Sequence, residues 1–244
     1  MSRKLPFEEL DFRETPLGDL ILRRRIVPSL DDLDVYEIIL GDAFLMSSLF
    51  TAVEIALSDL GLAAAGNGDP LDVVVGGLGL GYTAVAALKN SDVRSLLVVD
   101  YLEPVIEWHQ QGLAPLGPTL TEDSRCRFVH GDFFKLALGE DSGKRFDPND
   151  PDRKFHAILL DIDHSPSNLL HERHSTFYQP AGLRKLASQI HPGGVFALWS
   201  DDPPAPEFMT SLNEVFASSE SHVVTFYNPL QDKESESTVY IARK

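Results

Sequence analysis

Residues 71–100, LDVVVGGLGLGYTAVAALKNSDVRSLLVVD, decide the fold of this 244-residue chain. An apolar, β-branched run leads into glycines at positions 76, 77, 79 and 81, and a small-residue helix pattern follows. A second apolar run then ends at Asp100. This order of strand, glycine turn, helix, strand and acid predicts a doubly wound sheet whose acid accepts hydrogen bonds from ribose hydroxyls. We therefore expect the chain to bind an adenosine-containing molecule.

Two classes of nucleotide-binding protein use such a turn, and the spacing of the glycines separates them. Gly77, Gly79 and Gly81 satisfy directly the Gly-x-Gly-x-Gly pattern that is usual in the S-adenosylmethionine (SAM) methyltransferase fold. Gly79, Gly81 and Ala84 satisfy only loosely the Gly-x-Gly-x-x-Gly/Ala pattern of dinucleotide-binding proteins. The spacing favours SAM, although a strand-to-helix turn also requires glycine for backbone reasons alone.

Composition excludes several classes of protein. The length suits one α/β domain with a small N-terminal addition, and 43% hydrophobic residues are enough for a core. A net charge of −16 argues against nucleic-acid binding and makes a cationic small molecule easier to attract than an anionic one. No run approaches the roughly 20 apolar residues of a membrane span. The N-terminus lacks a secretory pattern, and the single Cys126 permits no intrachain disulfide, so we expect a cytoplasmic protein with an unreactive thiol.

The N-terminal part of the chain has strand-like and then helical patterns. Residues 1–41 predict a hairpin extension in which 18–24 pairs with 35–40, and Arg23–Arg25 are expected on a solvated turn or edge strand. Residues 42–70 predict a helix at 44–62 followed by a linker. Residues 71–244 are expected to form a SAM-methyltransferase-like catalytic domain.

From residue 71 onward, strand and helix patterns alternate, which predicts parallel strands joined by crossover helices. Strands are expected at 71–75, 95–100, 126–130, 155–161 and 194–199, and helices at 82–90, 103–112, 132–138, 175–190 and 205–218. The last two strand-like segments, 222–227 and 238–242, are joined by a loop too short for a crossover helix. The predicted fold is therefore α/β, a doubly wound, mostly parallel seven-stranded sheet with an antiparallel C-terminal strand. Residues 138–154 are expected to form a flexible surface loop.

Acidic side chains follow most of the predicted strands, at the sheet edge where ligands bind in doubly wound folds. They are Asp100, Asp132, Asp161, Asp163, Asp201 and Asp202. His171 and His174 are three residues apart, a possible ligand spacing, but their segment is loop-like and we expect no metal there. No Gly-x-Ser-x-Gly pattern exists that would indicate a hydrolase.

Several blocks of this edge resemble the spermidine synthase-like branch of the class I SAM-dependent methyltransferase superfamily, over about residues 71–200. The blocks are the glycine turn at Gly77, Gly79 and Gly81, VVDYLEPVIE at Asp100, HGDFF at Asp132, and LLDIDHSP at Asp161. The resemblance implies that the glycines line the cofactor and that Asp100 binds its ribose hydroxyls. It implies further that Asp132 binds the adenine amino group and that Asp161 acts on the acceptor amine.

The chain departs from that family where the amine is handled. Leu80 stands where the family's aspartate holds the aminopropyl amine of decarboxylated SAM. His164 stands where the family has a second acid, with Asp163 displaced by one position. The N-terminal hairpin also lacks the glutamine and the Asp-Glu-x-x-Tyr pattern that the family uses for the acceptor. The nucleotide half of the site is thus retained, and the amine-handling half is changed.

We therefore expect a SAM-dependent transferase that moves an alkyl group from SAM, or decarboxylated SAM, to a small amine-bearing acceptor. Methyl transfer is favoured over aminopropyl transfer because of Leu80. Asp161 is expected to be the catalytic carboxylate together with Asp163. His164, Tyr178 and Asp201 are expected to contact the acceptor. A polyamine aminopropyltransferase and a non-catalytic nucleoside-binding protein are the alternatives, and a homodimer is left open.

Overall fold

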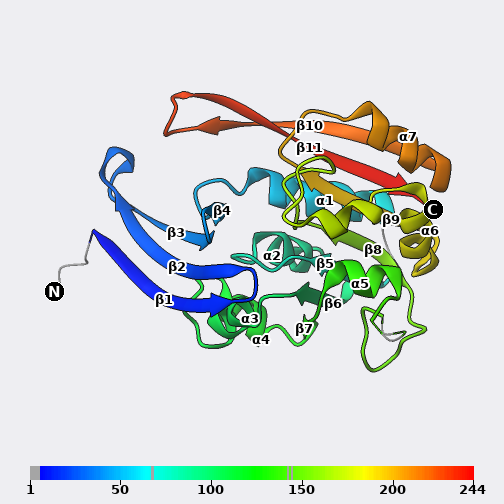
Figure 1. The fold of residues 1–244 in the computed structure, drawn as a ribbon, viewed down its shortest axis with the longest axis horizontal. Coiled ribbons are helices and arrows are strands. Elements are labelled where there is room, and N and C mark those ends of the chain that lie inside the picture. The colour runs from blue at the N-terminus through cyan, green and yellow to red at the C-terminus, as the bar shows by residue number, and fades with distance from the viewer. Residues whose placement is uncertain (1–5, 67–68, 142, 144) are drawn as a thin grey trace.

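The computed structural model describes residues 6–66, 69–141, 143 and 145–244. Within these residues the strands form two sheets. A four-stranded antiparallel sheet has the order β1-β2-β3-β4, and a seven-stranded sheet has the order β10-β11-β9-β8-β5-β6-β7. Figure 1 shows the N-terminal sheet to one side of the larger sheet, which is covered by helices on both faces.

The N-terminal sheet contains the predicted hairpin and two further strands. It consists of β1 (Phe7–Thr15), β2 (Gly18–Val27), β3 (Leu33–Leu40) and β4 (Ala43–Ser47). The predicted pairing of β2 with β3 is confirmed, with Leu20 opposite Leu40. The flanking strands β1 and β4 were not predicted, because their charged or short segments carry little alternation of apolar and polar residues.

The prediction that Arg23–Arg25 lie on a solvated turn or edge strand is wrong. They belong to β2, which is an interior strand paired with both β1 and β3. Arg24 is 7% exposed and forms ion pairs with Glu8 at 3.0 Å and Asp34 at 2.6 Å. The two neighbouring arginines both bind the buried Glu37, each at 2.7 Å. Arg24 can be buried because carboxylates from β1 and β3 neutralise it, whereas Arg23 and Arg25 are half-buried.

The predicted helix at 44–62 is wrong in its first half. Residues 43–47 form β4, and helix α1 begins only at Ala52 and ends at Ala65 (Ala52–Ala65). The apolar residues at 45, 49, 53, 57 and 60 fit a helical period, but Leu45 packs against the core from the strand β4. Five residues give too few alternations for a strand to be recognised against that period. The predicted linker is correspondingly shorter, and residues 67–68 lie outside the described residues.

The large sheet confirms the predicted fold class. Its strands are β5 (Leu71–Gly76), β6 (Val93–Asp100), β7 (Cys126–His130), β8 (Phe155–Leu160), β9 (Ile190–Ser200), β10 (Ser218–Asn228) and β11 (Lys233–Arg243). Strands β5 to β9 pair in parallel, whereas β10 pairs with β11, and β11 with β9, in antiparallel fashion. Burial raises the pKa of the thiol of Cys126, on β7, to about 12, which agrees with the expected unreactive thiol.

The helices after α1 cover both faces of this sheet. They are α2 (Tyr82–Lys89), α3 (Glu103–Gln110), α4 (Gly117–Glu122), α5 (Phe133–Leu138), α6 (Pro180–Ser188) and α7 (Pro206–Val215), with short 3-10 turns η1 (Pro28–Leu30) and η2 (Glu172–Thr176). Helix α4 was not predicted, and the predicted helix at 175–190 begins only at Pro180, a residue suited to the first helical position. In the described part of the chain, no helix is long and apolar enough to cross a membrane.

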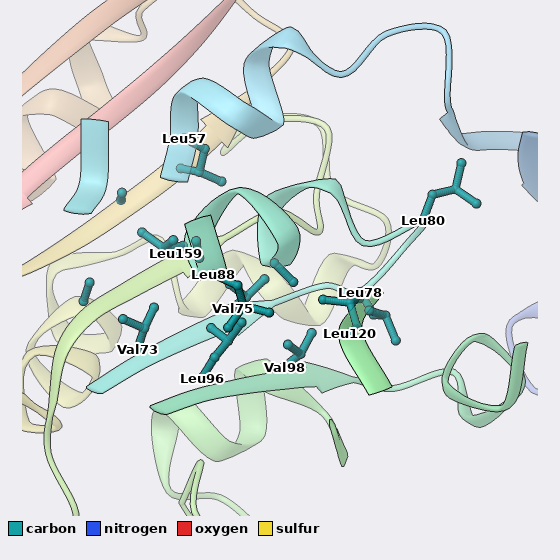
Figure 2. Packing of buried hydrophobic residues seen from close by; sticks show 14 of the residues in the cluster. Leu57, Val73, Val75, Leu78, Leu80, Leu88, Leu96, Val98, Leu120 and Leu159 are labelled. Atoms are coloured by element: carbon teal, nitrogen blue, oxygen red, sulfur yellow. The ribbon is translucent and has the colours of Figure 1, made fainter. Parts of the chain in front are cut away.

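Alternate residues of the central strand contribute to two separate cores. Val73 and Val75 of β5 pack with α1 to α4, whereas Val74 packs with α5 to α7 on the other face. Figure 2 shows the first of these cores, with Leu57 of α1 and Leu88 of α2 among the side chains that gather over the sheet. Burial on both faces explains why β5 is a continuous apolar run rather than an alternating one.

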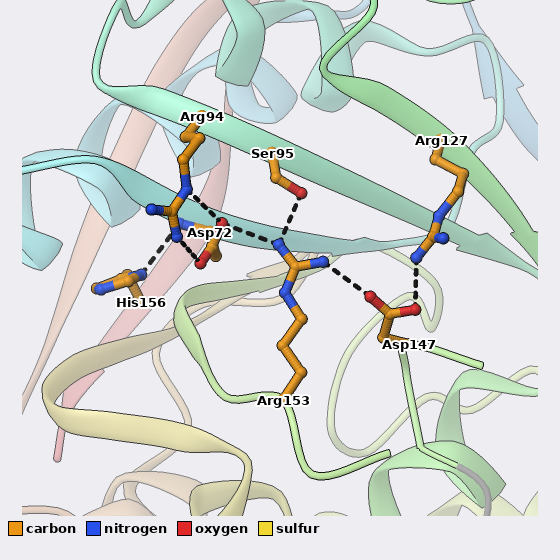
Figure 3. A network of polar contacts seen from close by, with 7 residues as sticks. All are labelled: Asp72, Arg94, Ser95, Arg127, Asp147, Arg153 and His156. Atoms are coloured by element: carbon orange, nitrogen blue, oxygen red, sulfur yellow. Dashed lines mark hydrogen bonds and ion pairs between the residues drawn. The ribbon is translucent and has the colours of Figure 1, made fainter. Parts of the chain in front are cut away.

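Residues 138–154 were predicted as a flexible surface loop, but part of this segment is anchored. Phe146 is fully buried and Asp147 is 4% exposed. Arg153 donates to Asp147 at 2.8 Å and to Asp72 of β5 at 2.9 Å, as Figure 3 shows. The guanidinium thus joins the segment to the amino-terminal end of the sheet. Partners distant in the sequence hold this segment, so its composition alone did not reveal the contact.

Candidate functional site

The carboxyl ends of β5 and β8 define the position where a ligand is expected. The chain leaves β5 toward β6 on one side, and β8 lies on the other side of β5, so the strand order reverses between them. Ligands of doubly wound sheets bind at such a switch point. The residues that follow the two strands meet there, since the Asp161 N–H donates to the Gly76 carbonyl at 2.8 Å. The glycine turn and Asp161 therefore bound the candidate site.

The packing of the protein itself requires glycine at all three positions of the turn. Gly77, Gly79 and Gly81 have φ values of +94°, +46° and +92°, a region that favours glycine. A Cβ on Gly77 would lie 2.0 Å from the Asp161 carbonyl oxygen, and one on Gly79 would lie 2.9 Å from the sulfur of Met46. A Cβ on Gly81 would lie 2.8 Å from a side chain of α4. The turn is thus wedged between β4, β8 and α4, and contact of the glycines with a cofactor stays a prediction.

Asp100 holds the glycine turn in place at the end of β6. Its two carboxylate oxygens each accept one backbone hydrogen bond at 2.8 Å, from Leu78 and from Leu102. Burial raises the pKa of this half-buried carboxyl, although these backbone donors favour its ionised form. Each oxygen can accept a second hydrogen bond, as binding of two ribose hydroxyls requires. The ribose contact stays a prediction, and Asp100 also has a structural role.

Asp132 caps the amino terminus of α5. Its Oδ1 accepts hydrogen bonds from the N–H groups of Phe134 and Lys135, at 3.1 and 3.2 Å. Its Oδ2 lies 3.3 Å from Arg173 but accepts no hydrogen bond. This oxygen is buried within the protein, so the contact of Asp132 with an adenine amino group stays a prediction.

Asp161 is half-buried and accepts a hydrogen bond from the Thr83 hydroxyl, at the start of α2, at 2.7 Å. Burial raises the pKa of Asp161 to about 6. Burial, and then repulsion by Asp161, raise the pKa of Glu54 on α1 to about 8. Glu54 was not singled out from the sequence. The available signal was an acid flanked by the buried Val53 and Leu57 within an apolar helix.

Asp163 and Tyr178 lie behind the rim of the site, in the second core. Asp163 is 1% exposed and accepts hydrogen bonds from the Leu170 N–H and the Tyr178 hydroxyl, both at 2.8 Å. Its carboxylate also contacts His174 Nδ1 at 2.9 Å, and Phe134 stacks on that imidazole at 3.8 Å. The loop after β8 turns this carboxylate inward, where protein donors satisfy it. Both side chains are buried behind the rim, and the predicted catalytic role of Asp163 and the predicted substrate contact of Tyr178 stay predictions.

His164 and Asp201 come together at the rim. The Asp201 N–H donates to the His164 carbonyl at 2.7 Å, so the loops after β8 and β9 are joined. His164 is half-buried and Asp201 is exposed, and their contact with an acceptor stays a prediction. His171 instead caps η2 through its Nδ1, which accepts from the Arg173 N–H. The described residues contain no group of three His, Cys, Asp or Glu side chains arranged to hold a metal ion.

A cavity of about 640 Å³ lies at the opposite end of the sheet, where the parallel strands begin. Its lining includes Asp72, Arg94, His156 and His191. It is remote from the switch point, which lies at the carboxyl ends of the strands. The cavity therefore does not mark the candidate site.

No family model matches this chain, but curated proteins and solved structures do. It is 31% identical over 139 residues to the polyamine aminopropyltransferase of Sulfolobus acidocaldarius, covering 55% of this chain and 40% of that protein. It is 28% identical over 167 residues to polyamine aminopropyltransferase 2 of Pseudomonas aeruginosa, covering 64% of this chain and 43% of that protein. The matches thus span less than half the length of these relatives.

Two solved structures resemble nearly the whole chain. A spermidine synthase in complex with the transition state analogue AdoDATO has a TM-score of 0.71 at 14% identity, covering 97% of this chain and 73% of that one. The spermidine synthase from Thermotoga maritima has a TM-score of 0.68 at 14% identity, covering 96% and 71%. The fold is therefore that of the spermidine synthases, as the resemblance found in the sequence implied.

Proposed function

We propose that this chain is a polyamine aminopropyltransferase, which moves the aminopropyl group of decarboxylated SAM to a primary amine of a small polyamine such as putrescine. The observation that carries the proposal is the half-buried Asp161 at the switch point, beside the glycine turn. The names of the similar curated proteins favour aminopropyl transfer over the methyl transfer that the sequence alone suggested.

The reaction is an in-line displacement at the carbon attached to the sulfonium of the donor. The amine nitrogen forms the new C–N bond, the C–S bond breaks, and its electron pair remains on sulfur, which leaves as neutral 5′-methylthioadenosine. The acceptor enters as an ammonium and must first lose a proton. Asp161 is suited to accept it, because its pKa of about 6 allows both protonation and release near neutral pH. The protein otherwise orients the two substrates and excludes water.

Methyl transfer is the second candidate, and Leu80 favours it. Leu80 is fully buried in the core that the N-terminal sheet also enters, and its N–H donates to the sulfur of Met46 at 3.3 Å. Figure 2 shows its side chain projecting from the turn, apart from the other labelled side chains. An apolar side chain at this position offers no carboxylate to the aminopropyl amine of decarboxylated SAM. The same donor site then suits SAM, whose methyl carbon is the electrophile.

Product analysis distinguishes these candidates. The protein is incubated with putrescine and either decarboxylated SAM or SAM, and products are identified by mass spectrometry. Spermidine and 5′-methylthioadenosine from decarboxylated SAM are expected. A methylated amine and S-adenosylhomocysteine from SAM, without spermidine, would favour methyl transfer instead. Binding of adenosyl compounds without either product would indicate a non-catalytic nucleoside-binding protein.

A further inference from the structure

The loop after β8 offers only one carboxylate to the candidate site. Asp163 is turned into the core, and His164 stands where the family resemblance implies a second acid. A diamine acceptor carries two positive charges at neutral pH, so its recognition favours more than one negative group. A second carboxylate would then have to come from another element of the fold.

Helix α1 lies against β8 and α2, and its packing determines which of its residues reaches the rim. A Cβ on Gly61 would lie 2.6 Å from Leu159 of β8, so the helix is in close contact with that strand. One turn earlier, the Ser58 hydroxyl donates to the Thr83 carbonyl at 2.6 Å. The Thr83 hydroxyl in turn donates to Asp161. Figure 1 shows α1 over this part of the sheet.

Glu54 lies one helical turn before Ser58, toward the carboxyl end of β8. Positions 54, 58 and 61 lie on one stripe of a helix, because residues three and four apart are neighbours on its surface. From Gly61 to Glu54 the helix advances by roughly 10 Å, since each residue adds about 1.5 Å. From Leu159 to Asp161 the strand advances by roughly 7 Å in the same direction. The stripe therefore brings Glu54 to the level of Asp161.

We infer that Glu54 is the second carboxylate of the reaction site, and that Glu54 and Asp161 together bind the ammonium of the acceptor. This inference rests on the proposed function. On binding, the cation favours the ionised form of Glu54, whose proton passes to solvent. Asp161 then accepts one proton from the ammonium, and the freed amine attacks the carbon on sulfur while the C–S electron pair stays on sulfur.

The charges around the pair agree with this role. Neither carboxylate takes part in an ion pair with a described lysine, arginine or histidine. The titratable side chain that acts on Glu54 is Asp161. Glu54 itself acts on Tyr82 at the start of α2: burial and then the charge of Glu54 raise the pKa of that phenol, although its hydrogen bond to Ser48 opposes this. Among the described residues of β9, β10 and β11, which also pack on α1, no further titratable group acts on Glu54. Two half-buried carboxylates without a cation repel each other, and a bound ammonium would relieve that repulsion.

Glu54 also has a purely structural interpretation. It lies in the first turn of α1, where a negative charge suits the helix dipole and the backbone N–H groups of Val53 and Glu54 favour its ionised form. Glu54→Gln keeps the size and the hydrogen-bonding capacity of the side chain but removes its charge. Asp59→Asn is the matched control, because it removes the same charge from an exposed position of the same helix.

The test measures putrescine binding by calorimetry at pH 7, in phosphate and in Tris, so that the number of released protons is obtained from the difference in heat. The wild type and Asp59→Asn should release roughly one proton per bound putrescine. Glu54→Gln should release none and bind at least about tenfold more weakly, because one partner of a buried charge contact is lost. Equal affinity and equal proton release in Glu54→Gln and wild type would overturn the inference.

Two further measurements separate this inference from the proposed function. If proton-linked binding depends on Glu54 but decarboxylated SAM gives no spermidine, the carboxylate pair stands and the proposed reaction fails. If putrescine does not bind to the wild type, the inferred ammonium site is overturned. The melting temperature between pH 5 and 8 tests the repulsion between Glu54 and Asp161 without any ligand. As pH rises, the melting temperature should fall less steeply in Glu54→Gln than in Asp59→Asn.

Discussion

Replacing Asp161 with asparagine separates a catalytic carboxylate from a structural one. Asparagine is nearly isosteric, and its amide oxygen can still accept the hydrogen bond that Thr83 donates at 2.7 Å. The amide is a poor base and carries no charge. Turnover of Asp161→Asn should therefore fall by roughly 10²–10⁴-fold, the usual range for loss of a general base. The fold and the binding of adenosyl compounds should be retained.

The same substitution should change the dependence of stability on pH. Burial raises the pKa of Asp161 from 3.8 to about 6, so between these values the folded protein binds a proton more tightly than the unfolded chain. The wild type consequently loses stability as pH rises through this range, and the loss is complete above it. Each tenfold ratio of proton affinities corresponds to about 1.4 kcal/mol, which gives about 3 kcal/mol in total. Asparagine does not ionise, so Asp161→Asn does not lose this stability. As pH rises, the free energy of unfolding of the variant should therefore increase relative to that of the wild type.

Urea unfolding followed by circular dichroism at pH 4, 6 and 8 measures this shift, and single-turnover product formation measures the catalytic loss. The shift between pH 4 and 8 should be about 2 kcal/mol, and Asp59→Asn, at an exposed position, should show none of it. Unchanged turnover in a folded, donor-binding Asp161→Asn would show that another group takes the proton. A loss of stability that is equal at all three pH values, with activity per folded molecule retained, would assign Asp161 a structural role.

Three further substitutions test the placement of individual residues. Asp100→Ala should abolish most of the increase in melting temperature that 5′-methylthioadenosine or SAM produces, and stabilisation of the wild type by NAD alone would contradict the adenosyl site. Leu80→Asp should lower the free energy of unfolding by roughly 3 kcal/mol or more, because it puts an unpaired charge in the core beside Met46; a stable variant with a new preference for decarboxylated SAM would refute this. Arg153→Gln should cost about 3 kcal/mol at pH 7, because Asp147 loses a buried partner. Burial raises the pKa of Asp147, but its ion pairs and hydrogen bonds have the larger effect and lower the pKa below its usual value. The stabilisation by the Asp147 carboxylate is therefore lost as pH falls, and the cost of Arg153→Gln should shrink below pH 4. A cost that is independent of pH in urea unfolding would argue against the ion pair.

Local pattern was sufficient for the large sheet. The run at 71–75 is buried on both faces, so continuous apolar, β-branched residues marked it as an interior parallel strand. The glycines of the following turn have positive φ values that other residues rarely adopt, so the turn was visible as well. The short connection between the last two strands allowed only a hairpin, which the structure contains. Each of these features depends on residues close together in the chain.

Features that depend on partners distant in the chain were missed or misassigned. Arg24 resembles a surface residue until β1 and β3 supply Glu8 and Asp34. The segment at 44–47 fits a helical period until β3 pairs with it as a strand. Burial of these groups is compensated by contacts that no local pattern contains.

The candidate site shows the same division. The sequence by itself determined that Asp161 follows a buried strand at the edge of a doubly wound sheet, because strand order and ligand position are linked in this fold. Only the tertiary structure decided that Asp163 turns into the core, where Tyr178 donates to it. Only the tertiary structure brought Glu54 to the level of Asp161, because the close packing of Gly61 on β8 determines which face of α1 meets the sheet. Side-chain direction at the end of a strand, and the approach of a helix from elsewhere in the chain, are determined by packing across the whole domain.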